Sequence, residues 1–127
     1  MFHLLNWFPE PEENCPILQK NTPRVLKRGE CFSVLTWNLQ FCASHRYIFF
    51  YDKGKTVHVS KEVVQDTLEA VAAVLQEISP DIVLLQEVDR DSARSGRIDE
   101  LEILAQKLNY PVWTGTPYHR SRFIPKP

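Results

Sequence analysis

The sequence has no strong excess of charge and no long apolar run, and each absence argues against a class of protein. Acidic and basic residues nearly balance, giving a formal net charge of -1. No global field therefore points to nucleic acid or to an anionic membrane. No apolar stretch approaches the ~20 residues that a membrane span needs. The opening segment MFHLLNWFPEPEEN has no basic region before its apolar residues, so we expect neither a signal peptide nor stable membrane insertion.

Cysteine is scarce and shows no pairing pattern. The chain has three cysteines, Cys15, Cys31 and Cys42, which form no CxxC motif and leave one residue over. This argues against a disulfide scaffold and fits a reducing compartment, so we expect a cytoplasmic protein. No internal repeat or low-complexity tract is present. The 127 residues are enough for one modest domain.

Proline is concentrated near the start of the chain. It recurs at Pro9, Pro11, Pro16 and Pro23. Because these residues interrupt regular structure, we interpret residues 1–30 as a proline-rich extension and residues 31–127 as the domain. The segment CFSVLTWNLQF then predicts a strand, with Val34, Thr36 and Asn38 on one face and the residues between them on the other. After it, residues 46–60 predict a hairpin or an ordered loop.

The segment SKEVVQDTLEAVAAVLQEIS has the clearest helical pattern. Its apolar residues recur at spacings of three and four and form one stripe: Val64, Leu68, Val71, Leu75 and Ile78. Ser60 is the expected N-cap, and Pro80 ends the helix because the residue before a proline is disfavoured in the α region. A second helix is predicted near residues 97–108, with the stripe Leu101, Leu104, Ala105 and Leu108. A strand is expected in VWTGT after it.

The segment DIVLLQEVD, residues 81–89, predicts a strand buried on both faces. A strand, a helix and a second strand of this kind indicate a βαβ unit with parallel strands. Asn38 and Glu87 then both lie at carboxyl ends, the edge where open α/β sheets bind ligands. An amide oxygen and a carboxylate are hard donors that suit Mg²⁺. The alternative is that Asn38 caps a turn and Glu87 is solvated, and both interpretations stay open at this point.

The segments VLTWNLQF and SPDIVLLQEVD resemble the first two motifs of the endonuclease/exonuclease/phosphatase superfamily, the DNase I-like metal-dependent phosphodiesterases. The intervening and following elements extend the resemblance over roughly residues 32–116. It implies an α/β fold, the N-terminal half of a DNase I-like four-layer α/β sandwich, in which a mixed sheet has flanking helices. It also implies a Mg²⁺ or Mn²⁺ cofactor and a phosphate-ester substrate, which could be nucleic acid, phospholipid or a small molecule.

Residue roles follow from the resemblance only where positions match. Asn38 matches the asparagine near the metal and the scissile phosphate, so the resemblance implies a catalytic and metal-binding role. Glu87 matches the metal-binding glutamate. Arg90 is the candidate substrate-binding residue, and it shares a polar loop with Arg94 and Arg97. A solvated loop without phosphate contact is the alternative for all three arginines.

The family motifs that supply the rest of the catalytic machinery do not occur in this sequence. It has no Asp-x-Asn pair and no Asp-His pair, and no histidine stands in a matching context. We therefore expect the first part of a longer Mg²⁺-dependent phosphodiesterase or phosphatase, truncated before the C-terminal half of the domain and inactive as this chain alone. One alternative is a non-catalytic interaction or binding module derived from the family. Another is an unrelated α/β domain with chance matches to both motifs.

Overall fold

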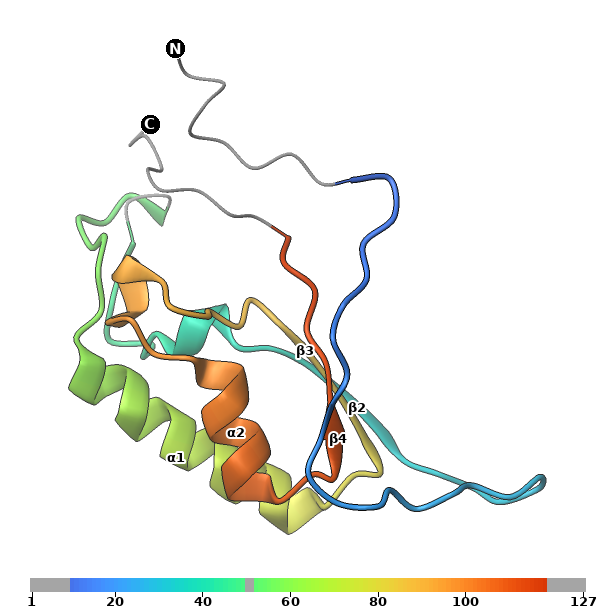
Figure 1. Ribbon diagram of the computed structural model, residues 1–127. Helices are drawn as coiled ribbons and strands as arrows, with labels where there is room; N and C mark the ends of the chain where they lie inside the picture. Colours follow the sequence, from blue (N-terminus) through green and yellow to red (C-terminus); the bar gives the residue numbers. More distant parts are fainter. Residues whose placement is uncertain (1–9, 50–51, 119–127) are drawn as a thin grey trace. The chain divides into compact units, whose positions relative to one another are not determined.

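The computed structural model describes residues 10–49 and 52–118 (Figure 1). The chain divides into two compact units, one formed by Pro23–Tyr110 and the other by Met1–Thr22 with Pro111–Pro127. Within the described ranges, neither helix combines the length and the apolar character needed to cross a bilayer. The larger unit holds the candidate site.

A pair of parallel strands forms the centre of the larger unit. Strand β2 (Val34–Asn38) pairs with β3 (Ile82–Gln86), and the register places Asn38 beside Gln86. Helix α1 (Lys61–Ile78) lies between them in the sequence. The predicted βαβ order with parallel strands is therefore confirmed. At the start of the pair, the Asp81 carboxylate accepts hydrogen bonds from the Ser33 N–H at 2.8 Å and from its hydroxyl at 3.0 Å, which helps to fix the register.

Helix α1 begins and ends where its sequence predicts. The Ser60 hydroxyl caps it by accepting a hydrogen bond from the Val63 N–H at 3.4 Å. Ser79 adopts a left-handed conformation after the last turn, and Pro80 follows. The predicted stripe is buried except for Ile78, which is exposed. Ile78 stands in the last turn, beside the left-handed residue that turns the chain toward β3, and it lies outside the buried cluster.

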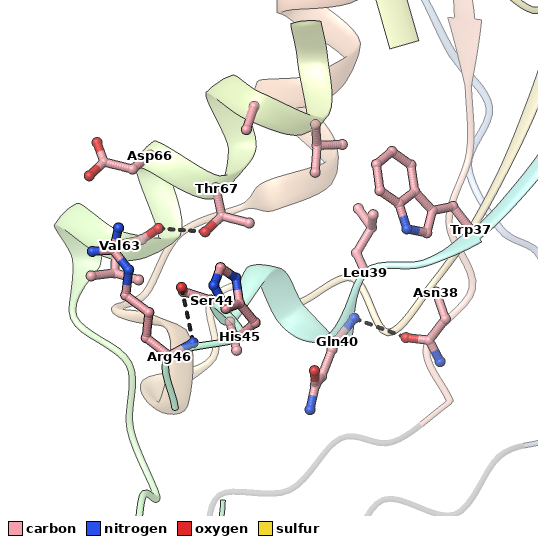
Figure 2. Close-up of a pocket in the computed structure, with 13 residues that line it drawn as sticks. Trp37, Asn38, Leu39, Gln40, Ser44, His45, Arg46, Val63, Asp66 and Thr67 are labelled. Atoms are coloured by element: carbon pink, nitrogen blue, oxygen red, sulfur yellow. Dashed lines mark hydrogen bonds between the residues drawn. The ribbon is translucent and has the colours of Figure 1, made fainter. Parts of the chain in front are cut away.

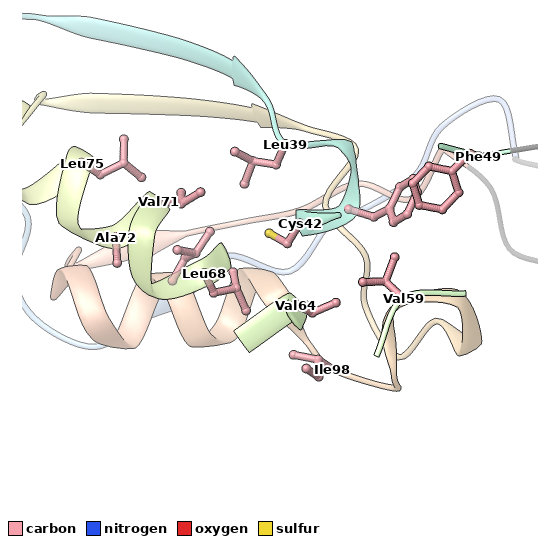
Figure 3. Packing of buried hydrophobic residues seen from close by; sticks show 12 residues of the cluster. Leu39, Cys42, Phe49, Val59, Val64, Leu68, Val71, Ala72, Leu75 and Ile98 are labelled. Carbon is pink, nitrogen blue, oxygen red and sulfur yellow. The ribbon is translucent and has the colours of Figure 1, made fainter. Parts of the chain in front are cut away.

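Helix α2 (Glu100–Leu108) starts later than the sequence predicts, because Asp99 caps it. The Asp99 carboxylate accepts a hydrogen bond from the Glu102 N–H at 3.0 Å. Of the predicted stripe, Leu104 and Ala105 are buried, while the two outer leucines are half-buried. Helices α1 and α2 lie on the same side of the strand pair and enclose the apolar cluster with it (Figure 3).

The prediction that β3 is buried on both faces is wrong. Its residues alternate, with Val83 and Leu85 packed against the core, whereas Ile82 is 37% and Leu84 is 51% exposed. Val34 on β2 is also 51% exposed. The reason is that both helices lie on one face of the pair (Figure 3). The exposed apolar residues belong to the other face.

The segment predicted as a hairpin or an ordered loop forms a loop. The Phe49 carbonyl accepts hydrogen bonds from the Asp52 N–H at 3.0 Å and from the Gly54 N–H at 2.8 Å. A Cβ atom on Gly54 would lie 1.9 Å from the Ile48 carbonyl oxygen, so only glycine fits this turn. Residues 50 and 51 of this segment lie outside the described residues.

The smaller unit contains a short antiparallel pair. Strand β1 (Leu18–Gln19) pairs with β4 (Val112–Trp113). The strand predicted in VWTGT is thus confirmed, but β1 lies in the segment interpreted as irregular. Backbone pairing explains the difference, because the hydrogen bonds of β1 come from a partner distant in sequence rather than from a local pattern. The domain boundary expected at residue 30 stays a prediction.

Candidate metal site at the strand ends

The two residues expected to form a metal site contact each other directly. Asn38 is the last residue of β2, and Glu87 directly follows β3. The Asn38 Nδ2 group donates a hydrogen bond to Glu87 Oε1 at 2.9 Å. Both side chains are exposed, so the pair is open to solvent. The parallel register thus brings the amide and the carboxylate together at one sheet edge.

The chemistry of its neighbours fixes the orientation of the Asn38 amide. Its Oδ1 accepts a hydrogen bond from the Gln40 N–H at 2.9 Å (Figure 2). A backbone N–H can only donate and a carboxylate can only accept, so the amide oxygen must face Gln40 and the amide nitrogen must face Glu87. Among the described residues, Glu87 Oε2 accepts no hydrogen bond. That oxygen is therefore free to bind an ion.

The backbone beside this pair is held in an uncommon conformation. Glu87 has φ of 53°, and Gln40, Phe41 and Cys42 have φ of 47°, 43° and 51°. Left-handed backbone is unfavourable for residues with a Cβ atom and persists only where the surrounding structure holds it. Two hydrogen bonds do so here, from the Leu39 N–H to the Gln86 carbonyl at 2.9 Å and from the Phe41 N–H to the Glu87 carbonyl at 2.6 Å. These bonds join the segments that follow β2 and β3.

A polar cluster lies beside these two segments. Arg94 donates two hydrogen bonds to the Asp89 carboxylate, each at 2.8 Å, and the Ser95 hydroxyl donates a third at 2.8 Å. The Asp89 N–H donates to Glu100 Oε2 at 2.9 Å. The Arg94 guanidinium also lies 3.8 Å from the centre of the Phe41 ring. The cluster thus contacts both the segment that follows β2, through Phe41, and the segment that follows β3, through Asp89.

Glu100 is fully buried within this cluster. Burial raises the pKa of its carboxyl to about 7, partly offset by the hydrogen bond from the Asp89 N–H. The negative charge of Asp89 raises this pKa further, and the positive charge of Arg94 lowers it. Glu100 Oε1 has no hydrogen bond of standard geometry among the described residues, although the Cys42 thiol interacts with the carboxyl. Burial also raises the pKa of Cys42, so its thiol stays protonated.

The sequence interpretation missed this cluster. Glu100 precedes Leu104 by four residues and therefore falls on the buried side of α2, where a carboxylate is rare without a partner. The position of Glu100 on this side of the helix was the one sequence feature that could have indicated a buried polar cluster. The partners of Glu100 could not be read from the sequence, because they come from separate segments brought together only by the fold.

The candidate substrate-binding residue Arg90 forms an ion pair. Its Nε lies 2.9 Å from Asp99 Oδ2, and the Arg90 side chain is 49% exposed. Arg97 likewise contacts Asp91, donating to its carbonyl at 3.0 Å. Exposed pairs of this kind are worth little and exchange readily. A phosphate contact by Arg90 stays a prediction.

A cavity of about 430 Å³ lies between the end of β2, the following loop and α1 (Figure 2). Trp37 and Leu39 line it from the helix-covered face of β2, while His45 and Arg46 lie toward its other end. Asn38 and Gln40 also line the cavity (Figure 2). The cavity therefore reaches the Asn38 end of the candidate metal pair.

The donor set fits a magnesium ion that is only partly enclosed by protein. In residues 10–49 and 52–118, no group of three or more His, Cys, Asp or Glu side chains is placed to hold a metal. Mg²⁺, however, usually takes one or two carboxylates and completes its octahedron with water and substrate phosphates. One free carboxylate oxygen at an exposed strand end satisfies that requirement.

Comparison with known proteins places the chain in a family. The family model described as Endonuclease/Exonuclease/phosphatase family matches residues 35–125, which is most of the chain. The match implies a DNase I-like fold, and this family typically uses divalent metals. No curated protein and no solved structure matches the chain. From its two motifs, its parallel βαβ unit and this match, the chain belongs to the endonuclease/exonuclease/phosphatase family.

Proposed function

We propose that this chain provides part of the metal site of a Mg²⁺- or Mn²⁺-dependent hydrolase of phosphate esters. The observation that carries the proposal is the 2.9 Å contact between Asn38 and Glu87 at the carboxyl ends of parallel strands. Family membership supports a phosphate-ester substrate. In this proposal, the chain forms the N-terminal half of the four-layer sandwich.

Each residue of the pair has a distinct part in the proposed chemistry. Glu87 holds the ion through its free Oε2, and Asn38 fixes the carboxylate by donating to Oε1. The Gln40 N–H fixes the orientation of the Asn38 amide by donating a hydrogen bond to its Oδ1. A divalent ion bound there would neutralise charge on the phosphoryl oxygens and orient the attacking water. Arg90 would contact the substrate phosphate by exchanging its exposed partner Asp99 for it.

We propose that these residues alone do not complete catalysis. Hydrolysis of this kind needs a general base besides the ion, and base catalysis typically contributes about 10²–10⁴-fold to a rate. The sequence has no Asp-x-Asn or Asp-His pair to supply that base. The proposed function of the 127-residue chain is therefore metal binding, with turnover requiring further residues.

The test is direct measurement of Mn²⁺ binding by electron paramagnetic resonance. We expect the wild-type chain to bind Mn²⁺ and Glu87→Gln to bind it at least ~10-fold more weakly, because a neutral amide replaces the charged oxygen ligand. Glu77→Gln is the matched control, since it removes the same charge from an exposed position on α1. Equal binding by the wild type and the Glu87 variant would remove Glu87 from the site.

One observation favours a second candidate, a non-catalytic interaction module. Val34, Ile82 and Leu84 place exposed apolar side chains on one face of the strand pair. Such a face is an association surface when nothing covers it. For this candidate we expect concentration-dependent self-association in sedimentation velocity, and Leu84→Lys to abolish it. A strictly monomeric wild-type chain would argue against the module.

A further inference from the structure

The segments that follow β2 and β3 share a contact with one side chain, Arg94. Its guanidinium lies 3.8 Å from the ring centre of Phe41, three residues after Asn38. The same group forms two 2.8 Å hydrogen bonds to the carboxylate of Asp89, two residues after Glu87. Arg94 therefore joins both chain segments that carry the candidate metal pair.

We propose that Arg94 is a positioning residue for Asn38 and Glu87, acting through Phe41 and Asp89. The proposal rests on the proposed metal site and extends it, because it assigns a structural task to an arginine that the sequence left as one of several loop residues. Arg94 contacts neither the ion nor the substrate in this proposal. It sets the geometry in which the carboxylate is presented.

The geometry of the contact explains why an arginine is needed. The planar guanidinium matches a carboxylate with two parallel hydrogen bonds while its face stacks on an aromatic ring. The Asp89 side chain is only 12% exposed, so water competes weakly for this pair. Ser95, which is fully buried, donates a further hydrogen bond to the same carboxylate. Lysine would keep the charge but lose the paired hydrogen bonds and most of the stacking.

Helix α2 gives this cluster a rigid base. The Asp89 N–H donates to Glu100, the first residue of α2, at 2.9 Å. Leu104, one turn later, is buried in the apolar cluster. The position of Asp89 is therefore set relative to the core rather than by the exposed loop alone.

The metal pair needs such support because its own contact is weak. The Asn38–Glu87 hydrogen bond is exposed, and water can replace either partner. Glu87 and Phe41 also hold left-handed backbone that they would leave without restraint. Arg94 contacts Phe41, whose N–H donates to the Glu87 carbonyl at 2.6 Å. Arg94 thus restrains Glu87 in two ways, through Asp89 two residues later in the same segment and through Phe41 in the segment after β2.

Arg97 provides a matched control in the same loop. Its side chain is 65% exposed, and its described partner is Asp91. Arg97→Met removes the same charge and the same length of side chain as Arg94→Met. It leaves the contacts to Phe41 and Asp89 in place. The two variants therefore separate loss of charge in the loop from loss of the shared contact.

The first measurement uses the metal-free chain and nuclear magnetic resonance. In Arg94→Met we expect the Asn38 side-chain amide signal to shift and the Phe41 backbone amide to exchange at least ~10-fold faster, through local opening. Amides of the α1 core, such as that of Leu75, should keep their exchange rates and so report that the fold is intact. Arg97→Met should leave all of these signals as in the wild type. An unchanged Asn38 signal with unchanged Phe41 exchange in Arg94→Met would overturn the proposal.

The second measurement is Mn²⁺ affinity. We expect Arg94→Met to weaken binding about 10- to 100-fold, the usual effect of losing a group that orients a ligand, and Arg97→Met to bind as the wild type does. If the wild-type chain binds no Mn²⁺, the proposed metal site fails, while the resonance measurement still decides the role of Arg94. If Arg94→Met does not fold, Arg94→Lys replaces it in both measurements. If Arg94→Lys then shows the same Asn38 signal, Phe41 exchange rate and Mn²⁺ affinity as the wild type, the proposal is overturned.

Discussion

Asn38 and Glu87 are 49 residues apart in the sequence, yet the amide of one donates a 2.9 Å hydrogen bond to the carboxylate of the other. The contact follows from the strand register, which sets Asn38 opposite Gln86 and leaves Glu87 one position beyond the sheet. Any shift of one residue in this register would move one side chain to the other face and separate the pair. The site therefore depends on the pairing of β2 with β3.

The first prediction concerns Asn38. Asn38→Ala removes the donor to Glu87 and the acceptor of the Gln40 N–H. We expect Mn²⁺ affinity to fall about 10-fold, because the carboxylate loses the group that orients it. The free energy of unfolding should fall by no more than about 1 kcal/mol, since both hydrogen bonds are exposed. Titration by electron paramagnetic resonance and urea denaturation measure the two effects, and an affinity equal to wild type would contradict the orienting role.

The second prediction concerns turnover. With saturating Mg²⁺ or Mn²⁺, we expect the purified 127-residue chain to hydrolyse no bis(p-nitrophenyl) phosphate above the rate of a metal-only blank, because the sequence has no Asp-x-Asn or Asp-His pair to supply the base. Release of p-nitrophenolate measures this. The decisive opposite result would be hydrolysis that a chelator stops and that Glu87→Gln also abolishes.

The third prediction is a dependence of stability on pH that originates at Glu100. Burial raises the pKa of this carboxyl from 4.5 to about 7 in the folded protein. Between these values the folded chain binds a proton that the unfolded chain has released. The stabilisation is therefore complete below about pH 4.5 and is lost as pH rises through about 7, a change on the order of 3 kcal/mol.

Glu100→Gln should remove this dependence, because glutamine keeps an acceptor for the Asp89 N–H but does not ionise. We expect urea denaturation between pH 5 and pH 8 to show falling stability for the wild type and a flatter profile for the variant. Glu77→Gln, at an exposed position, is the control and should follow the wild type. Parallel profiles for all three proteins would show that Glu100 does not carry the effect.

The fourth prediction tests the core. Leu68 is fully buried on the α1 face that packs against α2 and the sheet, so Leu68→Ala should reduce the free energy of unfolding by about 2–5 kcal/mol. Val74 lies on the same helix but is 39% exposed. Val74→Ala should therefore have a much smaller effect, since it leaves no enclosed cavity. Chemical denaturation monitored by circular dichroism compares the two, and equal losses would contradict the packing described for α1.

Local patterns predicted the elements that depend on local physics. The spacing of Val64, Leu68, Val71 and Leu75 predicted α1, and Ser60 and Pro80 predicted its ends. The alternation in β2 predicted which of its side chains share a face. The carboxyl ends of the two parallel strands predicted that Asn38 and Glu87 would meet, although the metal role assigned to them stays a prediction.

Features that depend on distant partners were not predictable in the same way. Consecutive apolar residues in β3 indicated burial on both faces, but how much of a strand is covered depends on the other elements. The bridging contacts of Arg94 required two segments to meet, and a loop rich in arginine gives no sign of which one bridges. The left-handed backbone at Gln40–Cys42 was also not predictable, because this segment contains no glycine or asparagine, the residues that usually adopt this conformation.

The left-handed backbone of Glu87 has a consequence for how mutations at this position should be judged. Glycine would adopt the same conformation without the penalty of about 1–2 kcal/mol that a Cβ atom incurs. Folding by itself thus gives no preference for glutamate here, and a search for more thermostable variants would tend to discard it. At this position fold stability favours glycine, whereas the proposed metal site requires glutamate.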